Sequence, residues 1–456
     1  MDIFPYGYRP GQKELVDFIS STVSEGGIGV IEAGTGTGKT VSSLSGSLPH
    51  VLGTDRKLIY LTRTKSQQKQ VVEEASALKV PVLCIALQGR SAQSCPMMRD
   101  DPDLSTGTSE EISGLCSAFK RKGPDGHSAC PYFDTISTVD LDAWAREVRE
   151  VHPDPEEFRS MCEAEGLCPY EFSKLLLPKA DVISVPYPFV FSPVIFSRFK
   201  DWVGISEERM SLVVDEAHNL PDYLRDLLTA ELSSYGLEHA EKEALEYGDS
   251  GLFDGISVSD VTSVLREMLG IAIREYLIDD DGLLPPDFLQ EQMLYRLGIT
   301  SGTLENLLRT MIDMGEQIAE SKKSKKKLPR SYVRSLGNFL RFWLTSDDRY
   351  YITMILGGDN PRFQVYCMDP SLAAGPLRNC RSSICMSGTL APLDAYIREL
   401  GLDGAVAFTS ATSFSKDNML TLYSGGVSMK YEERFEERNY RELLSEIKTC
   451  VGAVRV

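Results

Sequence analysis

Glycine alternates with threonine ahead of a lysine in the segment IEAGTGTGKT, residues 31–40, directly after an apolar run. Glycine has no Cβ, so the backbone here can turn several N–H groups towards the oxygens of one phosphate. The lysine would reach the β- and γ-phosphates of a nucleotide, and the following threonine would place its hydroxyl on Mg²⁺. The alternative is a glycine-rich turn between a strand and a helix, and Ala33 replaces the usual first glycine. The candidate nucleotide-binding residues are Gly34, Thr35, Gly36, Thr37, Gly38, Lys39 and Thr40.

Two adjacent carboxylates follow a second apolar run, in the segment SLVVDEAH, residues 211–218. The run predicts a short buried parallel strand, and α/β sheets place ligand-binding residues at the carboxyl ends of such strands. Asp215 is predicted to hold the same Mg²⁺ as Thr40, and Glu216 to orient or deprotonate an attacking water. GTPases usually lack the second carboxylate and kinases need an acceptor site, so the pair favours hydrolysis of a nucleoside triphosphate. The candidate catalytic residues are therefore Lys39, Asp215 and Glu216.

Two polar segments are candidates for nucleotide and nucleic-acid contacts. The segment YRPGQ supplies Arg9 and Gln12, and a glutamine amide can pair with the N6/N7 edge of adenine. A surface helix start is the alternative interpretation. The segment KLIYLTRTK predicts a strand that runs into Thr62, Arg63 and Thr64, whose hydroxyls and cation suit phosphodiester contact. A polar loop without a ligand is equally compatible with that pattern.

Four of the ten cysteines are candidate metal ligands, and three of these four precede proline. In bacterial ferredoxins a proline likewise follows a ligating cysteine. Successive gaps of 21, 14 and 38 residues mean that the ligands would come from separate local elements, and the C-x-x-C spacing of zinc ribbons is absent. This arrangement suits a 4Fe–4S cluster that pins a small domain. The candidate ligands are Cys95, Cys116, Cys130 and Cys168.

Two alternatives to the cluster remain open on spacing alone. Scattered cysteines are often small buried apolar residues, which is the interpretation preferred for Cys84, Cys367, Cys380 and Cys385. A zinc site could instead recruit His127 or His152. Cys162, six residues before Cys168, is the main rival for a ligand position.

The motifs AGTGTGKT, LTRT, DEAH and MSGTLAPLD occur in the order typical of superfamily 2 helicases. With the form SGTL and a cysteine-bearing insert, the chain resembles the xeroderma pigmentosum group D (XPD) family of DNA repair helicases. The resemblance implies an ATP-dependent 5′–3′ DNA helicase that translocates on single-stranded DNA and unwinds duplex in repair. It implies ATP, Mg²⁺ and a 4Fe–4S cluster as cofactors, and single-stranded DNA and duplex junctions as partners. It also implies that His218, Ser387 and Thr389 couple the nucleotide state to DNA.

Two further segments each allow two interpretations. FTSAT, residues 408–412, spells the more usual helicase triplet, but Ser410 is expected in a Ser/Thr-rich loop. Ser387 follows a predicted strand, as the geometry requires, and is preferred. Tyr187 and Phe189 lie on a proline-flanked loop after a predicted strand, where their rings could stack on single-stranded bases. Core packing of the same rings is the alternative.

These elements predict an α/β fold. The resemblance implies a RecA-like P-loop motor domain with an inserted 4Fe–4S domain and an inserted mainly helical arch, and leucine stripes with helical spacing support the helical insert. Residues 350–368 predict a β-hairpin with GGDN as its turn. The expected segments are 1–84, 179–220 and 349–400 for the first RecA-like domain, 85–178 for the cluster domain, 221–348 for the arch, and 401–456 for the start of a second RecA-like domain.

The second motor domain is expected to be incomplete. No Q-x-x-G-R-x-x-R pattern is present, and Arg455 is not a convincing arginine finger. We therefore expect this chain alone to bind ATP weakly and unwind little. A DNA-binding scaffold stabilised by the cluster, with ATP only as a conformational switch, is the alternative function, and an ATP-binding metalloprotein unrelated to DNA is a further one.

Composition limits the partners of the 456-residue chain. The formal net charge of −18 argues against one broad basic DNA-binding face, so nucleic-acid contacts must be local. The basic run at residues 321–327 is such a concentration, although runs of this kind are often solvated loops. No apolar stretch reaches the ~20 residues of a membrane span, and no signal peptide is recognisable. We expect a monomer, cytoplasmic in a prokaryote or nuclear in a eukaryote, neither secreted nor in a membrane.

Overall fold

The computed structural model describes residues 2–249, 251–410, 423–430, 433 and 436–453. The chain divides into two compact units, residues 1–411 and 412–456. No helix of the described residues is long and apolar enough to cross a membrane.

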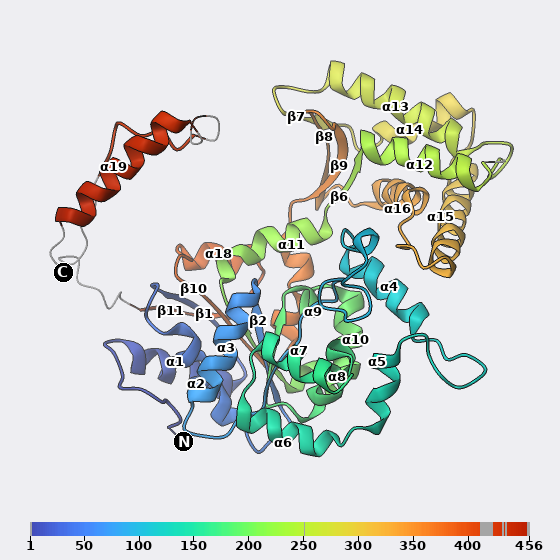
Figure 1. Cartoon of the computed structure of the whole chain (residues 1–456). Coiled ribbons are helices and arrows are strands. Elements are labelled where there is room, and N and C mark those ends of the chain that lie inside the picture. Colours follow the sequence, from blue (N-terminus) through green and yellow to red (C-terminus); the bar gives the residue numbers. More distant parts are fainter. Residues whose placement is uncertain (1, 250, 411–422, 431–432, 434–435, 454–456) are drawn as a thin grey trace. The chain divides into compact units, whose positions relative to one another are not determined.

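A seven-stranded sheet with every pairing parallel forms the centre of the larger unit (Figure 1). The strand order is β11-β1-β10-β5-β2-β4-β3. Its strands are almost continuously apolar, as expected for a sheet covered on both faces. Their bounds are β1 Ile28–Ala33, β2 Lys57–Thr62, β3 Cys84–Ala86, β4 Val182–Pro186, β5 Met210–Val214, β10 Ser382–Ser387 and β11 Val406–Ser410.

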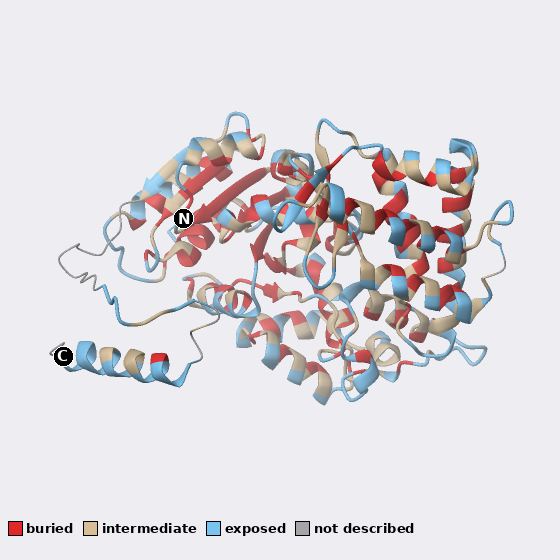
Figure 2. Cartoon of the chain, turned by 90° about the horizontal axis from the view of Figure 1, so that it is seen from above, coloured by how far each residue is buried: buried red, intermediate tan, exposed pale blue. Residues whose placement is uncertain are grey.

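Two hydrophobic cores cover the two faces of this sheet, and alternate residues of β2 belong to different cores. Leu58 and Tyr60 pack with helices α1 Gln12–Glu25, α2 Lys39–Ser47 and α3 Lys65–Ala77. Ile59 and Leu61 pack on the other side, with residues of α9 Pro188–Phe191, α10 Pro193–Val203, α11 Leu220–Leu228, α17 Gly375–Asn379 and α18 Leu393–Glu399. Figure 2 shows the buried residues in red along the strands and on the inward sides of the helices. The predicted α/β class is confirmed.

The cysteine-bearing region divides between two cores. Its first part, with α4 Ser109–Phe119 and α5 Pro131–Asp134, forms a small core of its own from residues 92–130. Its second part packs into the core of the large sheet through α6 Leu141–Val151, α7 Pro155–Ala164 and α8 Pro169–Leu176. The separate core is therefore shorter than the expected domain of residues 85–178.

A helical region with its own core lies between β5 and β10 in the sequence (Figure 1). The predicted hairpin forms as β8 and β9, but it pairs within a four-stranded antiparallel sheet, in the order β6-β9-β8-β7, and not with the motor sheet. The motor boundary expected at residue 349 is therefore wrong for these strands. The bounds are β6 Ala230–Ser233, α12 Ser234–Tyr247, α13 Val258–Glu275, β7 Asp281–Leu284, α14 Phe288–Leu297, α15 Ser301–Ser324, α16 Tyr332–Thr345, β8 Tyr351–Leu356 and β9 Arg362–Cys367.

The helical region contacts the small cysteine-bearing core through the loop between α15 and α16. Leu328 packs against that core, and Arg330 donates to both carboxylate oxygens of Glu111, at 2.7 and 2.9 Å. Burial alone would raise the pKa of Glu111, but hydrogen bonds from Arg330 and Thr108 outweigh burial and lower it. The basic run at residues 321–327 leads into this loop. Its Lys322 forms an ion pair at 2.5 Å with the buried Glu243 and so contributes to the packing of the helical region.

The smaller unit contains α19 Glu437–Ala453. Asn439 near its start accepts a hydrogen bond from the backbone N–H of Ser428, at 2.8 Å. The arginine considered as a finger, Arg455, lies outside the described residues, as do Ala411 and Thr412 of the FTSAT segment. Ser410, expected in a loop, instead ends the parallel strand β11, so that expectation is wrong.

The bidentate Arg330–Glu111 pair should contribute to the free energy of the contact between the helical region and the small cysteine-bearing core. Arg330→Gln removes a charge-assisted fork of two hydrogen bonds, which should weaken the contact by about 1 kcal/mol, or roughly fivefold. Hydrogen exchange of the backbone amides in residues 105–119 should accelerate accordingly.

The matched control is Arg349→Gln, which breaks an exposed bidentate pair with Asp347 inside one region and should leave that exchange unchanged. Because the pKa of folded Glu111 is lowered, the contact is present above its ordinary value of 4.5 and is lost as pH falls through the folded value. Equal exchange in Arg330→Gln and the wild type would contradict the prediction.

Candidate functional site

The glycine-rich segment forms the loop between β1 and α2. Gly36 and Gly38 have φ values of 76° and 73°, the left-handed region that glycine tolerates. Lys39 donates from Nζ to the carbonyl oxygens of Ala33, at 3.1 Å, and Gly34, at 3.4 Å. Ala33 is fully buried as the last residue of β1 and does not have positive φ, so a glycine is not required there.

The segment before α1 supports this loop from outside. Arg9 donates from Nη1 to the carbonyl of Gly36 at 2.7 Å. Gln12 donates from Nε2 to the carbonyl of Thr37 at 2.9 Å, and its Oε1 accepts the backbone N–H of Arg9 at 2.9 Å. The Gln12 side chain is thus engaged on both its polar atoms and is only 6% exposed. These bonds use one N–H and one lone pair of an amide that has two of each, so the pairing of Gln12 with adenine stays a prediction.

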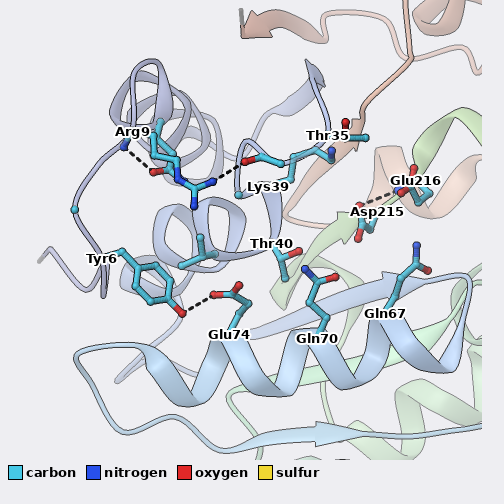
Figure 3. Close-up of a pocket in the computed structure, with 15 residues that line it drawn as sticks. Tyr6, Arg9, Thr35, Lys39, Thr40, Gln67, Gln70, Glu74, Asp215 and Glu216 are labelled. Carbon is cyan, nitrogen blue, oxygen red and sulfur yellow. Dashed lines mark hydrogen bonds between the residues drawn. The ribbon is translucent and has the colours of Figure 1, made fainter. Parts of the chain in front are cut away.

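The four residues on which the sequence interpretation depends line one pocket of about 490 Å³ (Figure 3). Lys39 and Thr40 come from the start of α2, and Asp215 and Glu216 follow β5. The hydroxyl and carboxylate oxygens of Thr40 and Asp215 are ligand types that Mg²⁺ prefers, so the residues fit the predicted ion. The roles assigned to the four side chains remain predictions.

Asp215 and Glu216 have unusual environments for acidic residues. Burial, reinforced by the charge of Glu216, raises the pKa of Asp215 to about 6, although the Glu216 N–H and Lys39 act in the opposite direction. A bound cation would reverse this effect by favouring the ionised carboxylate. Glu216 adopts φ 50°, which is uncommon for a residue with a Cβ. Its backbone N–H donates to the carboxylate of Asp215 at 2.9 Å, which holds the turn.

A chain of hydrogen bonds joins the loops after β2, β5 and β10. Ser387 Oγ lies 2.7 Å from Nδ1 of His218, and Nε2 of that ring lies 2.9 Å from Nδ2 of Asn219. Asn219 in turn accepts a hydrogen bond from the guanidinium of Arg63. Thr389 joins through its backbone N–H, which donates to Ser387 Oγ at 3.3 Å. The structure thus brings together the three predicted coupling residues and Arg63, which was predicted to contact DNA.

The loop after β10 also lies against the phosphate loop. Glu32 Oε1 accepts the backbone N–H groups of Leu390 and Ala391, both at 3.1 Å. A Cβ on Gly388 would stand 3.5 Å from Cγ2 of Thr35 and 3.7 Å from Nζ of Lys39. Sequence reasoning missed Glu32 and Asn219, although both lie within two residues of a recognised motif.

The remaining predicted DNA-contacting residues differ in accessibility. Arg63 is exposed, but Thr62 is buried. Thr64 caps α3, because its hydroxyl accepts the N–H of Gln67 at 3.2 Å. Tyr187 is 3% exposed and donates its hydroxyl to the carbonyl of Asp215 at 2.5 Å. The ring of Tyr187 therefore has no open face for a base, and the structure favours its core-packing alternative.

Three of the four candidate cysteines, Cys95, Cys116 and Cys130, belong to the small core or pack against it, and Cys168 lies directly before α8. Cys130 and Cys168 each precede a proline that begins a short helix, α5 or α8. Burial raises the pKa of Cys116, while the nearby charges of Arg90 and Lys120 lower it. Burial also raises the pKa of Cys168 to about 12, and the charges of Cys116 and Cys95 add to this effect, so these thiols are close enough to interact.

This donor set fits an anionic cluster in its chemistry, since thiolates and compensating cations occur together. Among the described residues, however, no three His, Cys, Asp or Glu side chains stand in an arrangement that could hold a metal ion. Of the rival ligands, Cys162 is fully buried in the core of the large sheet. His127 is exposed and lies 3.6 Å from Asp134.

Two family models match the chain. The model described as DEAD_2 matches residues 60–237, and the model described as helical and beta-bridge domain matches residues 240–433. The first range contains the acidic pair and the four candidate cysteine ligands, and the second contains most of the helical region and the SGTL motif. The boundary between the matches differs from that between the sheets, because β6 of the second sheet lies in the first range and β10 and β11 of the motor sheet lie in the second.

Similar curated proteins are longer than this chain. The general transcription and DNA repair factor IIH helicase subunit XPD of Dictyostelium discoideum is 23% identical over 98% of this chain and 66% of that protein. The corresponding subunit of Saccharomyces cerevisiae is 24% identical over 96% of this chain and 65% of that protein. The chain thus spans slightly less than two thirds of the length of these relatives.

Solved structures share the fold. One titled "XPD_Helicase" matches with a TM-score of 0.56 at 18% identity, covering 88% of this chain and 62% of that chain. One titled "Truncated XPD" matches with a TM-score of 0.53 at 18% identity, covering 88% of this chain and all of that chain. The matched domains, the relatives and the shared fold together show that this chain belongs to the XPD family of helicases.

Proposed function

We propose that this chain forms the ATP-binding motor part of an ATP-dependent DNA helicase, which moves 5′ to 3′ on single-stranded DNA and unwinds duplex in DNA repair. The observation that carries the proposal is the hydrogen-bonded path that runs from Ser387, next to Gly388 beside the phosphate loop, through His218 and Asn219 to Arg63. A simple ATP-binding protein has no need of such a path, whereas a motor must transmit the state of its nucleotide to the strand that it holds.

Each residue in the pocket has a chemical task in this proposal. Lys39 binds the β- and γ-phosphates, and Thr40 and Asp215 hold Mg²⁺, which neutralises charge on the phosphates. Glu216 orients the attacking water. Gly388 lies beside Thr35 and Lys39, so a γ-phosphate bound there would touch the loop that carries Ser387. A shift of this loop would move Ser387, which is hydrogen-bonded to His218 and, through that ring, to Asn219. Arg63, bonded to Asn219 at the other end of the path, contacts a DNA phosphate.

The inserted regions complete the proposal. The small core around Cys95, Cys116, Cys130 and Cys168 would hold a 4Fe–4S cluster, and the helical region with its antiparallel sheet would be the arch. Contacts that follow the phosphate backbone make DNA binding tolerant of sequence and sensitive to salt. The proposed cofactors are ATP, Mg²⁺ and the cluster.

Lys39→Ala should weaken binding of Mg²⁺–ATP at least tenfold, because a charge-assisted contact to the β- and γ-phosphates is lost in a pocket of low dielectric. The affinity for Mg²⁺–ATP is measured by competition against a fluorescent adenosine nucleotide. Affinity for a single-stranded oligonucleotide without nucleotide should stay within twofold.

The exposed Lys79→Ala serves as the charge-matched control and should bind as the wild type does. Unchanged ATP affinity in Lys39→Ala would remove the phosphate loop from the proposed motor.

Asn219→Ala should uncouple nucleotide from DNA, because it removes the connection between the His218 ring and the Arg63 guanidinium. We expect the wild-type Kd for single-stranded DNA to differ between an ATP analogue and ADP by at least fivefold. In Asn219→Ala this difference should fall below twofold, while ATP affinity is retained.

The control is Asn338→Ala, which breaks a similar asparagine–arginine contact with Arg341 on the exposed side of α16. If the Kd of Asn219→Ala for single-stranded DNA still differed at least fivefold between the ATP analogue and ADP, the proposed coupling path would be wrong. That result would favour the DNA-binding scaffold as the function.

The cysteine proposal predicts a coloured protein. Anaerobically purified wild-type chain should contain about four irons and absorb near 400 nm, and Cys116→Ser should lose both properties. Cys162→Ala should keep its iron, because Cys162 is buried in a different core. A colourless wild-type chain that contains zinc and no iron would show that the cluster assignment is wrong.

A further inference from the structure

A fully buried tyrosine lies behind the end of the pocket that carries the two proposed magnesium ligands. Tyr60 of β2 has no exposed surface, does not line the pocket and pairs in register with Val213 of β5. The backbone N–H of Asp215 donates to the carbonyl of Leu61, so the pairing of the two strands continues to the acidic pair. Side chains two residues apart on a strand point to the same face. Asp215 therefore leaves its strand on the face of the sheet that Tyr60 covers.

The hydroxyl of Tyr60 is bonded to the first turn of α2. Ser43 Oγ donates to this hydroxyl at 3.4 Å, and it also lies 2.9 Å from the carbonyl oxygen of Thr40, to which it donates. Burial and the charge of Asp215 raise the pKa of Tyr60, while hydrogen bonds from the side chains of Ser43 and Thr40 act in the opposite direction. A hydrogen bond that favours the ionised phenol is one that the phenol oxygen accepts. The Tyr60 oxygen is thus an acceptor for the hydroxyl of Thr40.

Packing alone does not explain the hydroxyl of Tyr60. The residues around its ring are apolar, and Leu58 and Val213 belong to the same core. A phenylalanine would fill this space without the free-energy cost of burying a hydroxyl. The hydroxyl must therefore act through the polar groups that it meets, and these belong to Ser43 and Thr40.

A hydroxyl that binds a cation has to direct its own proton away from that cation. Thr40 has one O–H proton, and the lone pairs of its oxygen are what Mg²⁺ would bind. A proton turned into the pocket would repel the cation. Thr40 lines the pocket and Tyr60 does not, so an acceptor on Tyr60 draws the proton towards the core.

We propose that Tyr60 is a positioning residue for magnesium: its oxygen accepts the Thr40 proton, so that a lone pair of Thr40 faces the cation. The inference rests on the proposed function, because it needs Mg²⁺–ATP in the pocket. Tyr60 itself touches neither the cation nor the nucleotide and acts through Thr40. Loss of one neutral hydrogen bond should weaken the binding of the cation about fivefold.

Tyr60→Phe tests the hydroxyl, because it removes that group and keeps the ring. The affinity for ATP is measured by competition against a fluorescent adenosine diphosphate, once with saturating Mg²⁺ and once with EDTA. The Kd in EDTA divided by the Kd in Mg²⁺ is the magnesium ratio, which should exceed one in the wild type. In Tyr60→Phe this ratio should fall about fivefold, and the Kd in EDTA should not change. Tyr396→Phe is the matched control and should keep the wild-type ratio, because Tyr396 is a buried tyrosine in the core on the other face of the sheet.

A double-mutant cycle tests whether Tyr60 acts through Thr40. Thr40→Val alone should lower the magnesium ratio, and the addition of Tyr60→Phe should lower it no further, because the acceptor has then lost its donor. A wild-type ratio in Tyr60→Phe would overturn this inference and leave the proposed function intact. Equal weakening of ATP with and without Mg²⁺ would do the same, since it would show that Tyr60 only supports the fold of the loop. A full magnesium ratio in Thr40→Val, or no response of the wild type to Mg²⁺, would overturn both.

Discussion

The parallel register of four central strands is the constraint on which the site depends. Ile31 of β1 pairs with Met386 of β10, and Val214 of β5 pairs with Cys385 on one side and Leu61 of β2 on the other. These strands therefore end in one row, and the loops that follow them are neighbours although up to about 350 residues separate them in the sequence. The residues of the pocket are brought together by the pairing of the strands and not by proximity in the sequence. A slip in one strand would remove a whole motif from it.

Burying a carboxylate at this edge of the sheet costs free energy, and hydrogen bonds fix the position of the buried Asp215. The Asp215 carboxylate is desolvated and next to Glu216, so its ionised form is disfavoured until a cation is present. Three groups hold it in place: the N–H of Glu216 and, through the backbone, Leu61 and Tyr187. Fixing a carboxylate before its cation arrives lowers the ordering cost of binding. Tyr187 is thus part of the support for the acidic pair, which explains its burial.

Sequence predicted the parts of the site whose chemistry is local, and missed those fixed by distant contacts. The phosphate loop and acidic pair were identifiable because glycine, lysine and carboxylate positions follow directly from phosphate and metal chemistry. The roles of Gln12 and Tyr187 were not, since nothing in either segment indicates which backbone groups will face its side chain. The hairpin of β8 and β9 was predicted as a unit, but its partner strand β6 lies more than 100 residues earlier. Its membership of a second sheet was therefore not predictable from the segment alone.

Helix α11 connects Asn219, in the hydrogen-bonded path, to the helical region. Asn219 stands directly before α11, and α11 ends at Leu228, just before β6 begins the helical region. Arg225 anchors this helix to Glu399 of α18. In the proposed motor, α11 would give a displacement of His218 and Asn219 a second route, to the helical region, besides the route to Arg63. The same two residues are placed to affect both the proposed DNA contact and the proposed arch.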